Sequence, residues 1–90
     1  MKAKDIERIS KALGDPHRLQ ILEDVKKHGW RQCADICESL PLAQPSISHH
    51  LKLLVDSGLL IFEKEGRSIR YTIDKEVFEN YLKFINSFTV

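Results

Sequence analysis

The stretch that decides the fold is ADICESLPLAQPSISHHLKLLVDSGLL, residues 34–60. Apolar residues recur at the spacing of one helix face over residues 32–40, and Pro41 ends that helix. Residues 42–57 repeat the periodicity, with an inner face of Ile47, Leu51, Leu54 and Val55. Proline is tolerated only in the first turn, so Pro45 places the start of this second helix near residue 44 or 45. The pattern predicts two short helices joined by a tight turn.

Further elements flank this pair. Residues 4–13 have one apolar face and end at Gly14, and Asp15-Pro16 then begins a helix that ends at Gly29. The segment LLIFEKEGRSIRYTID, residues 59–74, predicts two strands around a turn at residues 65–67. Residues 75–88 predict a last helix with a wide apolar stripe. The expected fold is mainly α with a small β-hairpin, in the order ααααββα: a winged helix-turn-helix in a single domain over residues 1–90.

Composition limits the classes of protein to which the chain can belong. Apolar residues make up 42% and charged residues 30% of the 90, an ordinary globular balance. The longest uncharged apolar run, residues 58–62, is far shorter than the roughly 20 residues that span a bilayer. The charged start MKAKDIERISKALG has no apolar core of a signal peptide, so we expect a cytoplasmic protein without membrane contact and with free thiols. The formal net charge is only +1, so nucleic-acid binding must depend on where the charges lie.

The helix over residues 42–57 has the polar outer face of a helix that reads the major groove of double-stranded DNA. Glutamine pairs with adenine, serine contacts bases or phosphates, and lysine suits guanine or phosphate. The inner face is aliphatic, as packing requires. The candidate DNA-binding residues on this helix are Gln44, Ser46, Ser48, His49 and Lys52. A merely solvated polar face is the alternative.

The hairpin adds cations that can reach the DNA backbone. Lys64, Arg67 and Arg70 lie at or beside the turn, although Glu63 and Glu65 partly offset them. Across residues 44–70, four lysine and arginine side chains stand against three carboxylates, which is a weak basic footprint. DNA binding would therefore rely on geometry and on two copies acting together. The low charge keeps a second hypothesis open, a winged-helix module that binds protein and not DNA. No phosphate loop, HExxH or CxxC motif is present, and we expect no enzymatic activity.

Three stretches of the chain resemble the ArsR/SmtB family of bacterial repressors. They are KALGDPHRLQIL (residues 11–22), the stretch 34–60 and EKEGRSIRYTID (residues 63–74). The resemblance implies a homodimer that binds an imperfect inverted repeat and represses until an inducer releases it. One departure is Ala43, where the family usually has a serine that caps the recognition helix. Losing that cap costs about 1 kcal/mol of helix stability unless another group serves.

The resemblance also implies that the first and last helices form the dimer interface. Both predicted helices have apolar faces that one winged domain need not cover fully. The alternative is that these residues only complete the core of one subunit. The expected interface comprises Ile6, Ile9, Leu13, Phe78, Tyr81, Leu82, Ile85 and Phe88.

A sensor site is the remaining question. Cys33 and Cys37 are four residues apart on one helix face. Two thiols in this arrangement can bind a soft metal or arsenite, or they can be oxidised and act as a redox switch. Only Cys37 matches a thiol position of the arsenic-sensing relatives, since Gln32 and Ala34 stand where the other thiols would be. Both cysteines also continue an apolar face, and we favour packing as their role. Residues 74–90 contain no histidine for the family's C-terminal zinc site, and no histidine pair has metal-site spacing within one helix. We expect neither a metal nor a cofactor.

Overall fold

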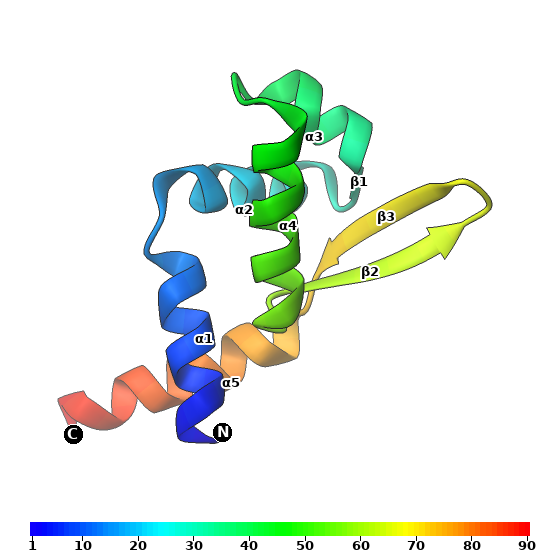
Figure 1. Cartoon of the computed structure of the whole chain (residues 1–90). Coiled ribbons are helices and arrows are strands. Elements are labelled where there is room, and N and C mark those ends of the chain that lie inside the picture. Colours follow the sequence, from blue (N-terminus) through cyan, green and yellow to red (C-terminus); the bar gives the residue numbers. More distant parts are fainter.

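The computed structural model describes residues 1–90, and it is a winged helix-turn-helix (Figure 1). Four helices precede a two-stranded wing, and a fifth helix follows it. The elements are α1 (Ala3–Leu13), α2 (Pro16–His28), β1 (Arg31–Gln32), α3 (Cys33–Ser39), α4 (Gln44–Asp56), β2 (Leu60–Glu65), β3 (Ser68–Ile73), α5 (Lys75–Asn86) and a 3-10 turn η1 (Ser87–Thr89). The predicted fold class and the order of its seven main elements are confirmed.

Local sequence signals set the helix boundaries. The Asp15 carboxylate accepts hydrogen bonds from the backbone N–H groups of His17 (3.0 Å) and Arg18 (3.1 Å), and caps α2. Gly29 ends α2 at a φ of 83°, a left-handed conformation that favours glycine. The Asp74 carboxylate caps α5 in the same way as Asp15 caps α2. The boundaries therefore follow the residue types that the sequence places there.

The sheet contains one strand that the periodicity did not predict. β3 lies between β1 and β2, antiparallel to both, and Arg31 pairs with Tyr71. We assigned Gln32 to a helix, but it forms the second residue of β1 and the N-cap of α3. Its strand pairing is with Arg70, far along the chain, so helix periodicity within residues 32–40 had no means of indicating it.

The wing is a hairpin with a tight turn. Glu65 pairs with Ser68, which leaves Gly66 and Arg67 as the two-residue loop. Gly66 has a φ of 59°, the left-handed conformation that such turns favour. The hairpin projects from the body beside α4 (Figure 1), so its tip is free to meet a partner.

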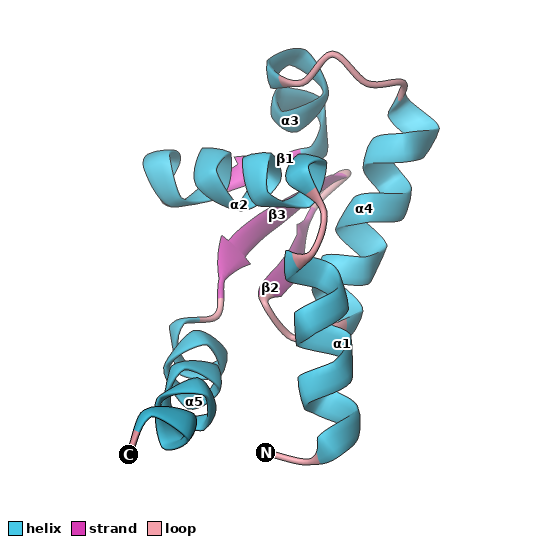
Figure 2. Ribbon diagram, turned by 90° about the vertical axis from the view of Figure 1, so that its left-hand side faces the viewer, coloured by secondary structure: helices cyan, strands magenta, loops and turns pink.

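The core lies where α1 to α4 and the base of the wing meet. Its residues are all aliphatic: Ile9, Ala12, Ile21, Leu22, Val25, Ile36, Leu40, Ile47, Leu51, Leu54, Leu59 and Leu60. The helix α5 buries none of its residues fully, and it extends away from the body together with the N-terminal part of α1 (Figure 2). The predicted inner face of α4 is confirmed, and the chain alone leaves its two terminal helices partly uncovered.

Two expectations need correction. Ile9 was assigned to the dimer interface, but it is 1% exposed because the chain's own core covers it. It has no surface left for a partner. The last helix was expected to run to residue 88, whereas the α-helix ends at Asn86 and a 3-10 turn continues it to Thr89. Tighter hydrogen bonding is common at the last turn of a helix.

Candidate nucleic-acid interface

The outer face of α4 is polar and open. Gln44, Ser46, Ser48, His49 and Lys52 are all exposed. On the opposite face Ile47 and Leu54 are completely buried. Burial of the aliphatic face fixes the orientation of the helix on the body, so the five polar side chains share the solvent side. The structure thus brings together the α4 residues that the sequence singled out.

The N-terminus of α4 has no side-chain cap. Ala43 is the N-cap residue, and its side chain offers no acceptor for the first N–H groups. The Ala43 carbonyl instead accepts from the backbone N–H groups of Ser46 (3.0 Å) and Ile47 (3.1 Å). No other side chain supplies an acceptor at this position. Since Pro45 has no N–H, the Gln44 N–H is the one donor of the first turn without a partner in the chain, and a phosphate oxygen can accept from it.

The cations of the wing have unequal surroundings. Lys64 and Arg67 are exposed near the tip, and neither takes part in an ion pair. The guanidinium of Arg70 lies 4.1 Å from the ring centroid of Trp30 and is 3.2 Å from a Glu65 oxygen. Arg70 is thus held within the subunit, by cation–π contact and by an ion pair, and is less free to reach a phosphate than Arg67. Neither contact was evident from sequence spacing.

Arg18 joins three helices behind the α4 face. Its Nε donates to the Ala12 carbonyl at 2.9 Å, and its Nη2 donates to the Lys11 carbonyl at 2.9 Å. Its Nη1 lies 3.2 Å from Nδ1 of His50 on α4. Arg18 lies in the stretch 11–22 that resembles the family, but the sequence did not indicate its partners, because only the fold brings them close. The side chain fixes the end of α1 and the start of α2 against the middle of α4.

Three groups that can bind a cation meet beside Arg18. Donor atoms of Asp15, His17 and His50 all lie within 4.8 Å of one another. Burial lowers the pKa of His50 below its usual value, whereas the backbone N–H of Arg18, which donates to Asp15, lowers the pKa of that carboxyl. At neutral pH the cluster therefore offers a neutral imidazole on α4 and a carboxylate on the turn before α2. The sequence spacing did not indicate this cluster, because His50 comes from a different helix.

The two cysteines lie half-buried against the core. Burial raises the pKa of the Cys33 thiol, and the nearby Cys37 adds to the shift. Burial likewise raises the pKa of the neighbouring Tyr71 hydroxyl. A raised thiol pKa leaves little thiolate for a metal or an oxidant. The surroundings of the cysteines favour packing as their role.

The terminal helices expose large apolar side chains. Leu82 is 58% exposed, Ile85 42% and Phe88 75%, whereas Ile6, Leu13, Phe78 and Tyr81 are half-buried. The Tyr81 hydroxyl lies 2.8 Å from the Ser10 hydroxyl, and this hydrogen bond ties α5 to α1. Exposed apolar surface of this kind marks an interaction site.

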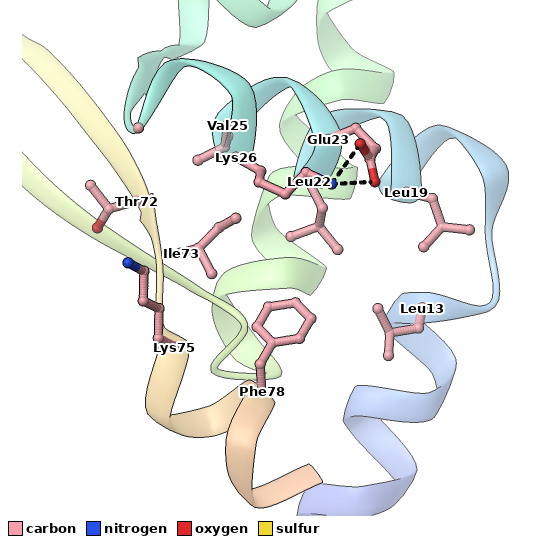
Figure 3. A pocket seen from close by; sticks show the side chains of 11 residues that line it. Leu13, Leu19, Leu22, Glu23, Val25, Lys26, Thr72, Ile73, Lys75 and Phe78 are labelled. Atoms are coloured by element: carbon pink, nitrogen blue, oxygen red, sulfur yellow. Dashed lines mark hydrogen bonds and ion pairs between the residues drawn. The ribbon is translucent and has the colours of Figure 1, made fainter. Parts of the chain in front are cut away.

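An open hollow of about 560 Å³ lies between α2, the end of β3 and the start of α5 (Figure 3). The side chains of Leu13, Leu22 and Phe78 line it from three elements. At its rim the Lys26 ammonium pairs with the Glu23 carboxylate at 2.9 Å. Leu13 and Phe78 thus connect the hollow to the apolar surface of the terminal helices. None of the helices of the chain is long and apolar enough to cross a lipid bilayer.

A winged helix-turn-helix with an exposed polar recognition helix defines a class, the DNA-binding transcriptional regulators. Comparison with known proteins then identifies the family, since residues 15–61 match the model of the bacterial regulatory proteins of the arsR family. The arsenical resistance operon repressor of Staphylococcus xylosus is 37% identical over 86 residues, which cover 96% of this chain and 78% of that protein. The chain belongs to the arsR family of bacterial regulatory proteins.

Solved structures agree with this assignment. An ArsR family transcriptional regulator superposes with a TM-score of 0.88 at 26% identity, covering 99% of this chain and 91% of that one. A homodimeric winged helix-turn-helix DNA-binding domain from Mycobacterium bovis superposes with a TM-score of 0.77 at 27% identity, covering 90% and 75%. The chain is an ArsR-type transcriptional regulator and not an enzyme. Family membership favours DNA over protein as the partner of the winged helix.

Proposed function

We propose that the chain is a homodimeric repressor that binds an inverted-repeat operator and is released by an inducer. The observation that carries this proposal is the two-sided character of α4. Its aliphatic side is locked into the core, while Gln44, Ser48 and His49 share the open side beside the wing. A helix held in this way can insert its first turns into the major groove without losing its packing.

The two exposed regions, the outer face of α4 and the wing, contact different parts of the DNA. On α4, Gln44, Ser46, Ser48 and His49 read base edges, and Lys52 reads a base or holds a phosphate. On the wing, Lys64 and Arg67 contact the sugar-phosphate backbone. Arg70, which pairs with Glu65 and lies over Trp30, supports the base of the wing and contributes less directly.

A dimer explains why the terminal helices are uncovered in one chain, and it explains how a chain of low net charge can bind DNA. Leu82, Ile85 and Phe88 gain burial when a second copy covers them. Two copies also double the number of phosphate contacts, which compensates for a net charge of only +1 per chain. A twofold axis between subunits requires two half-sites of opposite orientation, which is an inverted repeat. The proposed interface comprises Ile6, Leu13, Phe78, Tyr81, Leu82, Ile85 and Phe88.

The test is a binding titration on a palindromic duplex taken from the DNA upstream of the chain's own gene, against a scrambled duplex of the same length. We expect the wild type to prefer the palindrome, and Gln44→Ala or His49→Ala to lose about 1–3 kcal/mol of that preference. Binding to the scrambled duplex should hardly change, because base contacts contribute little to non-specific affinity.

Gln20→Ala serves as the matched control, since Gln20 is an exposed glutamine on α2. It should leave the preference unchanged. Equal loss on both duplexes in the Gln44 and His49 variants would contradict base reading. Absence of binding to any duplex would instead favour the protein-interaction module.

A further inference from the structure

The cluster of Asp15, His17 and His50 lies outside the proposed DNA-reading face. Asp15 is the N-cap of α2, His17 lies in the first turn of that helix, and His50 lies in the middle of α4. An Asp15 oxygen is 3.9 Å from Nδ1 of His17 and 4.0 Å from Nδ1 of His50. The two imidazole rings are 5.7 Å apart between centroids. Thus three donors from two helices converge on one point.

The donor set suits a borderline transition metal. Zinc binds imidazole nitrogen and carboxylate oxygen, both at about 2.0–2.2 Å, and open sites have three protein ligands with water as the fourth. Bonds of that length bring neighbouring ligand atoms within roughly 3.5 Å of each other, so donors that lie up to 4.8 Å apart must close by up to about 1.3 Å. His17 can make this movement, because its side chain is 46% exposed.

The surroundings also leave lone pairs of the ligand atoms available to a metal ion. The His50 side chain is 13% exposed, and its Nδ1 already lies 4.0 Å from the carboxylate and accepts a hydrogen bond from Arg18. A nitrogen that accepts is unprotonated, so its lone pair is available to a metal. Asp15 Oδ2, the oxygen that lies 3.9 and 4.0 Å from the two histidines, also accepts the two backbone N–H bonds that cap α2, whereas Oδ1 accepts none and is open to a cation.

We propose that Asp15, His17 and His50 bind one divalent transition-metal ion per subunit, with zinc as the best-suited ion. The ion ties the start of α2 to the recognition helix. In this arrangement it replaces Arg18 as the partner of His50 Nδ1, while Arg18 keeps its bonds to the Lys11 and Ala12 carbonyls. The nearby guanidinium weakens the affinity through charge repulsion, so the site is a reversible one.

The test is a titration of the full chain with Co²⁺, a spectroscopic probe for zinc sites, followed by visible absorption. We expect one Co²⁺ per chain and no sulfur-to-metal charge-transfer band. His17→Gln and Asp15→Asn should each weaken binding at least 10-fold, the lower end of the roughly 10–100-fold loss that removal of an outer-shell partner already causes. Asparagine is as good an N-cap as aspartate, so Asp15→Asn keeps the cap of α2.

His28→Gln is the matched control. His28 lies near Asp24, with Nδ1 3.5 Å from the carboxylate, but no third donor completes that pair. This variant should bind Co²⁺ like the wild type. The proposal is overturned if the wild type binds no Co²⁺, if both His17→Gln and Asp15→Asn bind as the wild type does, or if thiolate charge-transfer bands dominate.

A consequence for DNA rests on the proposed function. His50 directly follows His49, so the ion adds positive charge beside the DNA-reading face, and we expect Zn²⁺ to strengthen operator binding by the wild type but not by His17→Gln. Unchanged operator affinity at saturating Zn²⁺ would overturn this linkage. Failure to bind DNA with or without Zn²⁺ would overturn the proposed function, and the Co²⁺ titration of the free protein would still decide the site.

Discussion

Arg18 illustrates how one side chain organises the region behind the recognition helix. Three of its nitrogens contact α1 or α4, and two of them satisfy carbonyls at the C-terminal end of α1. The last carbonyls of a helix have no partner within the helix, so a guanidinium there also complements the helix dipole. The planar fork of arginine makes this possible, and lysine would satisfy only part of it.

The missing cap of α4 gives a prediction at the same scale. Ala43→Ser places an acceptor at the N-cap, and we expect it to stabilise the protein by about 1 kcal/mol. Chemical denaturation of the two proteins measures the difference. Ala43→Val has a larger side chain but no acceptor and should give no gain. Equal stabilities of Ala43→Ser and Ala43→Val would show that capping is not the limiting interaction.

At the scale of elements, the wing has one arginine that is free to contact DNA, Arg67, and one that is held by contacts within the subunit, Arg70. Arg67→Ala should weaken binding to all duplexes and reduce the salt dependence by about one unit of slope, because one phosphate contact is lost. Arg70→Ala is the comparison, since Arg70 contacts Trp30 and Glu65. We expect Arg70→Ala to destabilise the wing and to change the salt dependence of DNA binding only slightly. The slope of affinity against salt concentration checks both, and an unchanged slope in Arg67→Ala would contradict the wing contact.

The role of the Cys33 and Cys37 thiols on helix α3 can be tested by substitution. The double variant Cys33→Val, Cys37→Ala keeps this face apolar, so we expect folding, DNA binding and any inducer response to stay close to the wild type. DNA release by arsenite, a soft metal and an oxidant should be compared in the two proteins. A variant that binds DNA normally but stays bound when the wild type is released would make α3 the sensor.

At the scale of the whole molecule, the uncovered face of α5 predicts the assembly. Ile85→Asp places a charge on that face, which costs several kcal/mol when a partner buries it. We expect a folded monomer that has lost operator affinity, because it holds only one half-site. Ile85 is a better choice than Phe78, which packs against the core and whose replacement would disturb folding. Sedimentation and circular dichroism together separate these two effects.

Asn80→Asp is the control for the assembly. It adds the same charge at another exposed position of α5 and should leave the dimer intact. A wild-type protein that sediments as a monomer at micromolar concentration would contradict the proposed assembly.

Much of the fold could be predicted from local patterns. The inner face of α4, the cap at Asp15 and the turn at Gly66 depend on residues close together in the sequence, so periodicity and residue type were enough. The exposure of the polar α4 side chains followed from the same periodicity. The polar outer face and the aliphatic inner face of α4 were therefore predictable before any tertiary contact was known.

Long-range contacts decided the rest. The pairing of Arg31 with Tyr71, the stacking of Arg70 on Trp30 and the burial of Ile9 each depend on segments that only the folded chain brings together. The cluster of Asp15, His17 and His50 arises in the same way, because α2 crosses α4 at that point. Periodicity reports which face of an element is apolar, but it does not report which residue of another element that face will meet. Packing of the helices determines those partners, and with them the candidate metal site.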